Sequence, residues 1–305
     1  MALRGPTPRV FRLSLRSQPE RGGPVRATVE DKDGLEKDTD WRHLLVLVHG
    51  FNNPESEAEG KYDRYLDILR PGLEKSRVAP DVVAKFHWPG NAAVGPFPIF
   101  DFAGYPVDVQ RALQSVGPLA AFLSRLIATR PAGRLISFVG HSLGCRLIAE
   151  AMCRLVAAGP TGPPLAVVSL MAAAVPVALA EAGGMLAGAP AAAAKVLKAH
   201  SRNDWVLWLA FPAGQSLAWA AGIEQAVYVE AVGRNGNPAG FGESLPRKGN
   251  GHGDYWTDEF AAAVLLVTMD ATLRSLPPPA EIPPHDLPPV GETPARDLKS
   301  RELPP

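Results

Sequence analysis

The stretch LISFVGHSLGCRLIAEAMCRLVA, residues 135–157, decides the fold. Its first five residues are apolar except for Ser137, which is typical of a buried strand. From Leu143 to about Ala158 the pattern is that of a helix. Between the two, Gly140-His141-Ser142-Leu143-Gly144 matches the G-x-S-x-G nucleophile elbow, a tight turn from which a serine hydroxyl projects. We therefore predict Ser142 at the start of a helix, where free N–H groups favour an oxyanion.

The segments around this unit repeat the alternation of strand and helix. Apolar runs predict strands, and amphipathic patterns between them predict helices. The predicted strands are residues 44–48, 82–88, 165–170, 194–199 and 225–232, and the predicted helices are residues 55–73, 108–128, 205–221 and 257–276. This alternation predicts an α/β fold with a mostly parallel central sheet, right-handed crossovers and helices on both faces.

The two ends of the chain differ from this central region, which we place at residues 41–276. Residues 1–40 form a polar lead-in, in which residues 10–15 and 24–29 alternate as edge strands or a hairpin would. Residues 277–305 contain ten prolines and predict a disordered tail. Proline-recognition modules could bind this tail weakly, although a plain solvated terminus is the simpler interpretation.

Composition excludes several classes of function. The 305 residues are 46% hydrophobic with a formal net charge of +0, so neither nucleic acid nor an anionic membrane is an expected partner. The longest apolar stretch, residues 165–180, is interrupted by Pro176 and is too short for a transmembrane segment. Residues 1–26 lack the apolar core of a secretory signal. Cys145 and Cys153 lie too far apart on one predicted helix for a disulfide, which indicates a reducing, cytoplasmic location and no metal site.

Two further motifs follow predicted strands and complete a catalytic set. Asn203-Asp204 follows the strand near residue 200, and Gly251-His252-Gly253 follows the last strand after a loop. Functional groups gather at the carboxyl ends of strands in parallel sheets. The order Ser142, Asp204, His252 is the one that the α/β-hydrolase fold uses. We predict Ser142 as the nucleophile, His252 as its general base, and Asp204 as the carboxylate that orients the imidazole.

Neighbouring residues compete for these roles. Asp254 and Asp258 lie close to His252 in the sequence and compete with Asp204, although either could cap the helix that follows. His200 competes with His252, and His285 is discounted because it lies in the tail. His141 adjoins the nucleophile, but in an elbow its position directs it away from Ser142. We predict a packing role for His141.

The turn after the first central strand predicts the oxyanion hole. His49-Gly50-Phe51-Asn52 follows residues 44–48, and the amides of Phe51 and Leu143 are the expected donors, with Asn52 in reserve. The predicted pocket wall comes from the aromatic loop after residue 82, with Trp88, Phe97 and Tyr105 as substrate contacts, although ordinary loop anchoring explains it equally well. We expect Trp205, Trp208, Phe211 and Trp219 in the core, and only a minimal cap.

These motifs carry a resemblance to a known superfamily over residues 42–274. The chain resembles the α/β-hydrolases, and within them the uncharacterised bacterial esterase-like proteins with an HGF-N turn, a Trp-Pro pair and a G-H-S-L/M-G elbow. Here these features are His49-Gly50-Phe51-Asn52, His87-Trp88-Pro89 and Gly140-His141-Ser142-Leu143-Gly144. The family also favours an Asn-Asp pair, matched by Asn203-Asp204, and a histidine beside aromatic residues, matched loosely at residues 252–256.

The resemblance implies the fold and the type of reaction, and it implies no substrate. We expect a serine esterase that acts on a small-molecule ester or acyl compound and needs no metal or organic cofactor. Two other functions stay open. One is an acyltransferase that uses the same three residues, and the other is a non-catalytic binding or scaffold protein. The arginine-rich front and the proline-rich tail depart from the family pattern, and neither is expected to bear on the triad.

Overall fold

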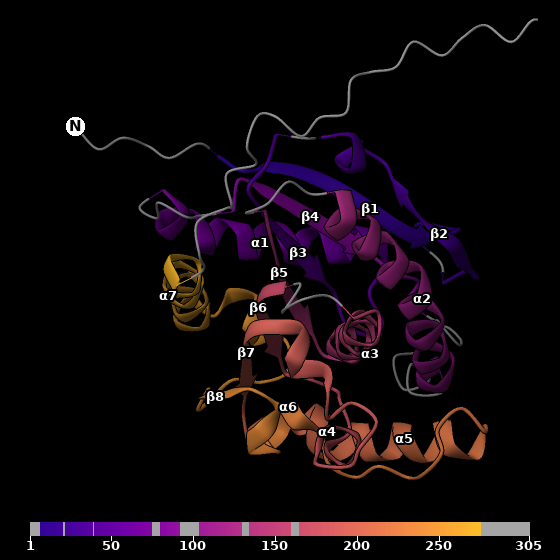
Figure 1. Ribbon diagram of the computed structural model, residues 1–305. Helices are drawn as coiled ribbons and strands as arrows, with labels where there is room; N and C mark the ends of the chain where they lie inside the picture. The colour runs from indigo at the N-terminus through magenta and orange to yellow at the C-terminus, as the bar shows by residue number, and fades with distance from the viewer. Residues whose placement is uncertain are drawn as a thin grey trace, which may run out of the picture.

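A single eight-stranded sheet runs through the computed structural model (Figure 1), which describes residues 7–20, 22–38, 40–74, 80–91, 104–129, 134–159 and 165–275. The strand order is β2-β1-β4-β3-β5-β6-β7-β8. All neighbouring strands are parallel except β1 and β2, which form an antiparallel pair. The strands are β1 (Arg9–Arg16), β2 (Val25–Asp31), β3 (His43–Val48), β4 (Val82–His87), β5 (Leu135–His141), β6 (Leu165–Met171), β7 (Ala193–His200) and β8 (Glu243–Pro246).

Helices cover both faces of the sheet. The helix α1 packs with α7 on one face, and α2 packs with α3 on the other (Figure 1). The α-helices are α1 (Glu55–Leu73), α2 (Tyr105–Thr129), α3 (Leu143–Ala157), α4 (Val177–Ala180), α5 (Phe211–Ala220), α6 (Val232–Asn235) and α7 (Glu259–Ser275). Shorter segments are the 3₁₀ turns η1 (Leu35–Lys37), η3 (Ala189–Ala192), η5 (Ala239–Phe241) and η6 (Asp254–Thr257), and the π-helical segment η4 (Val206–Ala210). This is the α/β-hydrolase fold class predicted from the sequence.

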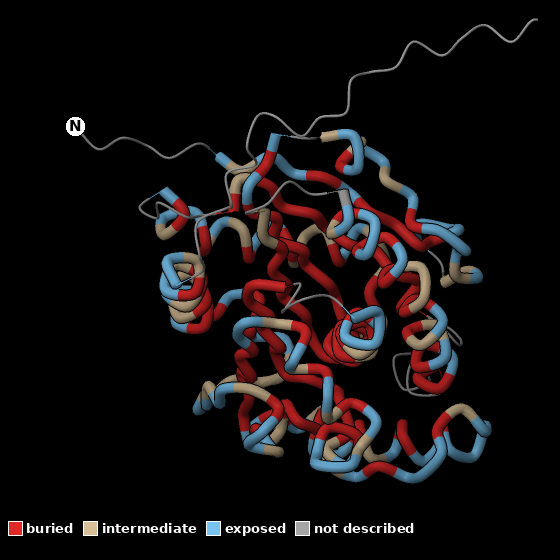
Figure 2. The backbone as a smooth tube through the Cα atoms, in the orientation of Figure 1, coloured by how far each residue is buried: buried red, intermediate tan, exposed pale blue. Residues whose placement is uncertain are grey.

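The core lies between the sheet and these two helical layers. Every residue of β3, β4 and β6 is buried, as the continuous red strands of Figure 2 show. A strand that packs against helices on both faces has no solvent-facing side, so its sequence is predominantly apolar rather than alternating. The central strands and the helices α1, α2 and α3 accordingly lie within three residues of their predicted bounds.

The front of the chain belongs to the same sheet. The predicted alternating segments form the hairpin β1–β2, and β1 pairs with β4 along Arg9 to Ser14. Only β2 lies at the edge. Residues 10–15 therefore form an internal strand of the sheet, between β2 and β4, and not an edge strand.

The strand predicted at residues 225–232 is wrong. This segment makes a single β-bridge, between Ala231 and Pro176, and α6 begins at Val232. Two of its apolar side chains, Val227 and Val229, face solvent at 41% and 69% exposure. The eighth strand is instead β8, whose residues Glu243–Pro246 are mostly exposed. An edge strand of this kind needs no apolar run, so hydrophobicity gave no signal for it.

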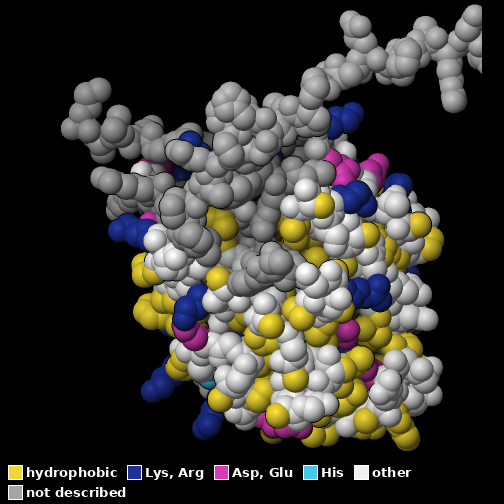
Figure 3. Space-filling model, viewed as in Figure 1, with side chains coloured by type: hydrophobic (Ala, Val, Ile, Leu, Met, Phe, Trp, Pro, Cys, Tyr) yellow, Lys and Arg dark blue, Asp and Glu magenta, His cyan; other side chains and the backbone are white. Residues whose placement is uncertain are grey.

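The prediction that the tryptophans near residue 210 are core residues is also wrong. Trp205, Trp208 and Trp219 are 52–64% exposed, and only Phe211 is buried. The segment from residue 205 to residue 223 contains no charged residue, so its sequence does not distinguish an outer face from an inner one. Hydrophobic side chains accordingly gather on the lower part of the molecular surface in Figure 3, where Figure 1 places α4 and α5.

The structure also bears on the expectations for the cysteines and for a transmembrane segment. Cys145 and Cys153 are both free thiols. No helix in the described part of the chain combines the length and the hydrophobicity that a membrane-spanning segment requires. The tail at residues 277–305 and the aromatic residue Phe97 lie outside the described residues.

Candidate active site

Ser142 occupies a strained turn between β5 and α3. Its backbone has φ 52° and ψ −123°, a region that non-glycine residues rarely adopt. The strain is held in place by close packing of the start of α3 against the turn after β3. A Cβ atom at Gly144 would lie 2.3 Å from the carbonyl oxygen of His49, so only glycine allows this approach. The predicted elbow is therefore present, with Ser142 at its apex.

The structure brings the three predicted catalytic side chains together. Nε2 of His252 lies 2.9 Å from Oγ of Ser142, and Nδ1 of His252 lies 2.8 Å from Oδ2 of Asp204. Asp204 follows β7, and His252 lies in the loop between β8 and η6. The side chain of Asp204 is fully buried, whereas that of His252 is 18% exposed. The carboxylate end of this chain of contacts is thus closed to solvent, and His252 is its most exposed member.

The competing carboxylates hold the His252 loop instead. Asp254 accepts a hydrogen bond from the amide of Gly251 at 2.7 Å. Asp258 binds the guanidinium of Arg247 through both carboxylate oxygens, at 2.6 and 2.9 Å, and accepts the amide of Ala261 at the start of α7. Burial alone would raise the pKa of Asp258, but these hydrogen bonds hold it below its usual range. Both residues thus fix the loop that carries His252.

The two other candidate histidines have different partners. Nε2 of His200 lies 2.7 Å from Oγ of Ser244, in the neighbouring strand β8. His141 donates from Nε2 to the carbonyl oxygen of His252 at 2.7 Å, and the two rings lie 4.9 Å apart. Burial holds the pKa of His141 well below its usual value, so the ring stays neutral. His141 therefore supports the backbone of His252, a more specific contact than the predicted packing role.

The turn after β3 is held by a buried network. Nδ1 of His49 donates to the carbonyl oxygen of Gly50 at 2.9 Å, and Nδ2 of Asn53 donates to the same oxygen at 3.1 Å and to that of Phe51 at 2.6 Å. A Cβ atom at Gly50 would lie only 2.8 Å from Cβ of Ser142. The turn thus lies directly against the nucleophile.

Arg16 connects the front of the chain to this turn. Its side chain is buried and donates to the carbonyl oxygen of Asn53 and, at 2.8 Å, to Oδ1 of Asn91. Nη2 of Arg16 also lies 3.3 Å from Nε2 of His49. Burial and then the charge of Arg16 hold the pKa of His49 well below its usual value, so the ring is neutral and Nε2 can accept this contact. The front therefore contacts the turn that lies beside Ser142, although these contacts do not reach Ser142, His252 or Asp204 themselves.

Trp88 supports the same turn by packing against His49. Its side chain is fully buried, stacks on the ring of His49 at 5.4 Å, and donates from Nε1 to the carbonyl oxygen of His49 at 2.8 Å. It does not line the pocket, so the expected substrate contact is corrected to a structural one. The tryptophan of the Trp-Pro pair at the end of β4 packs against the turn after β3. A sequence motif alone does not distinguish such a packing role from a role in ligand binding.

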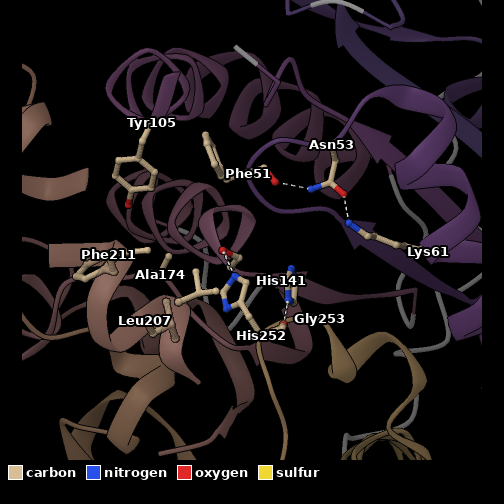
Figure 4. A pocket seen from close by; sticks show the side chains of 13 residues that line it. Phe51, Asn53, Lys61, Tyr105, His141, Ala174, Leu207, Phe211, His252 and Gly253 are labelled. Carbon is tan, nitrogen blue, oxygen red and sulfur yellow. Dashed lines mark hydrogen bonds between the residues drawn. The ribbon is translucent and has the colours of Figure 1, made fainter. Parts of the chain in front are cut away.

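A cavity of about 140 Å³ opens beside Ser142 (Figure 4). Phe51, Tyr105 and Phe211 lie toward one end of it, and Asn53 and Lys61 lie at the other. The lining residues are Phe51, Asn53, Lys61, Tyr105, His141, Ser142, Ala174, Val206, Leu207, Ala210, Phe211, His252 and Gly253. Of the predicted substrate contacts, Tyr105 lies in this wall.

Several lining residues were not predicted from the sequence. Leu207 and Phe211 come from the uncharged segment at residues 205–223, which was interpreted as core. Asn53 and Lys61 come from the turn after β3 and from α1. Asn53 directly follows the HGFN turn, which was a usable signal, whereas nothing in the sequence distinguishes Lys61 from other helical lysines. Among the described residues, no group of three or more His, Cys, Asp and Glu side chains is placed to hold a metal ion.

Comparison with known proteins places the chain in a family. No curated protein sequence matches it. Among solved structures it is similar to TT1662 from Thermus thermophilus, with 17% identity, coverage of 77% of this chain and 90% of that one, and a TM-score of 0.43. It is also similar to an uncharacterised protein from Bacillus cereus ATCC 10987, with 14% identity, coverage of 81% and 63%, and a TM-score of 0.43.

A third similar structure is SOBER1 of Arabidopsis thaliana, with 17% identity, coverage of 76% of this chain and 99% of that one, and a TM-score of 0.40. The family model described as an alpha/beta hydrolase of unknown function, DUF900, matches residues 27–210. This match spans more than half of the chain and includes Ser142 and Asp204. The chain therefore belongs to the DUF900 family of alpha/beta hydrolases.

Proposed function

We propose that this alpha/beta hydrolase is a serine esterase that cleaves small carboxylic esters through an acyl-enzyme. The observation that carries the proposal is the continuous chain of contacts from Ser142 Oγ through the His252 ring to Asp204, at 2.9 and 2.8 Å. A serine hydroxyl does not ionise by itself near neutral pH, so it needs a base within hydrogen-bond reach to accept its proton. His252 has this position.

Each residue then has one role in the reaction. Ser142 Oγ attacks the ester carbonyl carbon while its proton passes to Nε2 of His252. The buried carboxylate of Asp204 holds Nδ1–H of His252 and stabilises the imidazolium that forms. The tetrahedral intermediate expels the alcohol, which takes the proton from His252 and leaves Ser142 acylated. Water, deprotonated by His252, attacks the acyl-enzyme and releases the acid.

The orientation of the turn after β3 supports Phe51 as an oxyanion donor. The carbonyl oxygen of Gly50 is held by His49 Nδ1 and Asn53 Nδ2. In a trans peptide the N–H of the next residue points opposite to that carbonyl, so the Phe51 amide points away from these two side chains. The amide of Leu143, the first residue of α3, is the second proposed donor, because the first N–H groups of a helix have no partner within it. We keep Phe51 and Leu143 as the oxyanion hole.

The size of the cavity supports small substrates. An apolar cavity of about 150 Å³ accommodates a benzene ring, and the pocket beside Ser142 is of similar size at about 140 Å³. Its apolar end, at Tyr105 and Phe211, fits a short acyl chain or a single ring. A longer acyl chain would have to extend beyond this cavity.

Hydrolysis of 4-nitrophenyl acetate and butyrate tests the proposal. We expect the purified protein to release nitrophenolate faster than its Ser142→Ala variant by about 10³-fold or more. Measurement of both free acid and alcohol separates hydrolysis from acyl transfer. Equal rates for the protein and the variant would overturn the proposal and favour a binding protein with a hydrolase fold.

A further inference from the structure

The cavity beside Ser142 has two chemically different ends. Phe51, Tyr105 and Phe211 make one end apolar, whereas the other end presents the side chains of Asn53 and Lys61 (Figure 4). Among the described lining residues, Lys61 is the one whose side chain carries a permanent formal charge, and no carboxylate lines the cavity. Lys61 is therefore the charged side chain that a ligand in the pocket would contact directly.

Lys61 is held at this position by two partners. Its ammonium group donates to Oδ1 of Asn53 and, at 2.7 Å, to Oε1 of Glu57 one turn earlier on α1. An ammonium group has three N–H donors, so two partners leave a third donor for a ligand. Asn53 is 3% exposed, and its Nδ2 atom donates to the carbonyl oxygens of Gly50 and Phe51. The lysine is therefore anchored to the turn that lies against Ser142.

The carboxylate of Glu57 offsets only a small part of the positive charge that Lys61 presents to a ligand in the pocket. The Glu57 side chain is 51% exposed, whereas that of Lys61 is 21% exposed. An exposed pair of this kind within one helix contributes little, because water screens it. An anion inside the partly enclosed pocket would meet the same ammonium group with less screening. Charge in the pocket thus favours a negatively charged ligand group over a neutral one.

We propose that this pocket selects esters that carry a carboxylate on the side of the scissile bond that faces Lys61 and a short apolar group on the other side. Lys61 is then the residue that determines substrate charge, and Asn53 positions it. The inference rests on the proposed esterase function and adds a substrate class to it. Either the acyl or the alcohol half of the ester could carry the carboxylate, and the experiment distinguishes the two.

Two matched substrate pairs test the inference with the full chain. Monomethyl succinate is compared with methyl butyrate for a charge on the acyl half, and 4-acetoxybenzoate with 4-methylphenyl acetate for a charge on the alcohol half. The measured quantity is the ratio of kcat/KM for the charged ester to that for its neutral partner. We expect the Lys61→Met variant to lower this ratio about tenfold in one of the pairs, and the Lys61→Arg variant to retain most of it.

Two other variants are the controls. Lys32→Met removes a lysine of similar exposure, 24%, that is likewise paired with a glutamate, Glu55, but lies outside the pocket wall. It should leave both ratios unchanged. Glu57→Gln removes the competing carboxylate and should raise the ratio that Lys61→Met lowers. A lysine that only supports Asn53 would not produce these opposite changes, since it would affect charged and neutral esters alike.

Binding to the Ser142→Ala variant gives a second readout that needs no catalysis. Calorimetry should show that the charged ester of the selected pair binds more tightly than the neutral one, and that the difference falls on adding Lys61→Met and at high salt. Equal ratios for the protein and Lys61→Met in both pairs, with methyl butyrate still hydrolysed in a Ser142-dependent way, would overturn the inference alone. If no ester is hydrolysed, the esterase proposal fails, and equal binding of charged and neutral esters would then overturn the inference as well.

Discussion

Nδ1 of His252 lies 2.8 Å from Oδ2 of Asp204, although 48 residues separate the two in the chain. The other carboxylate oxygen of Asp204 accepts the amide of Leu207 at 3.0 Å. The carboxylate is fully buried, so it is fixed between the ring of His252 and the start of the segment that lines the cavity. One oxygen therefore contacts His252 and the other supports the backbone. A substitution that removes the charge but keeps the size of the side chain can distinguish these two roles.

Asp204→Asn tests the role of the charge. Asparagine can still accept the amide of Leu207, but it no longer stabilises the imidazolium of His252 or fixes its tautomer. We expect kcat for 4-nitrophenyl butyrate to fall by about 10⁴-fold, with the circular dichroism spectrum unchanged. Asp254→Asn is the control, because Asp254 contacts the amide of Gly251 and not the ring of His252. Similar losses in both variants would mean that Asp204 acts only through the fold.

Gly50→Ala tests the contact between the turn after β3 and the nucleophile. The added Cβ atom would lie 2.8 Å from Cβ of Ser142 and 3.0 Å from Nδ1 of His141, so the turn must shift. Because oxyanion donors act through precise placement, we expect kcat to fall by about 10²-fold or more. Gly60→Ala on α1 is the matched control. Its added Cβ would meet no neighbouring element within 4 Å, and alanine should stabilise the helix by about 0.5–1 kcal/mol.

Arg16→Met tests whether the front of the chain supports the site. The variant leaves the carbonyl oxygen of Asn53 and Oδ1 of Asn91 without their buried donor. We expect urea unfolding to show a loss of about 2–4 kcal/mol, together with lower esterase activity. Arg12 is the control on the same strand. It pairs with Asp33 at the surface, and Arg12→Met should cost less than about 1 kcal/mol. Equal costs at the two positions would contradict the supporting role of Arg16.

Glu59 predicts a specific dependence of stability on pH. Burial opposes its ionisation, but hydrogen bonds from His87 and Lys85 outweigh this effect and lower the pKa of Glu59 to about 2. The usual value is 4.5, so the ionised group's contribution to stability is complete above about pH 4.5 and is lost as the pH falls toward 2.

Urea unfolding of the Glu59→Gln variant measures this contribution. The variant should be less stable than the unmodified protein at neutral pH, and the difference between the two should shrink as the pH falls from 4.5 to 3. Glu243, in the exposed strand β8, is 58% exposed, and Glu243→Gln should change stability little at either pH. A difference for Glu59→Gln that stays constant down to pH 3 would show that its carboxylate is not stabilised by these partners.

Much of the fold could be predicted because burial on two faces leaves a pattern in the sequence. The last five of the six residues of β3 are apolar, and α1 shows its buried residues Tyr62, Tyr65 and Leu69 at helical spacing. The elbow at Ser142 was also predictable, since its glycines are required by packing. Where a strand lies at an exposed edge, as β8 does, no such pattern exists.

The rest of the site depends on contacts that a sequence pattern does not record. Asp204 and Asp254 are equivalent by residue type, and only the fold decides which carboxylate lies against His252. Arg16 and Trp88 support the turn after β3 from segments remote in the chain. The sequence did not show which face of the segment carrying Phe211 points inward, because its outward face is equally apolar.

Labelling with a fluorophosphonate, followed by peptide mapping, tests the central claim most directly. These reagents phosphonylate a serine hydroxyl that a neighbouring base has activated, with loss of fluoride, and leave ordinary serines unmodified. The geometry predicts a single adduct on Ser142, absent from Ser142→Ala and strongly slowed in His252→Ala. Absence of any adduct on Ser142 in the folded protein, under conditions that label a known serine esterase, would contradict it.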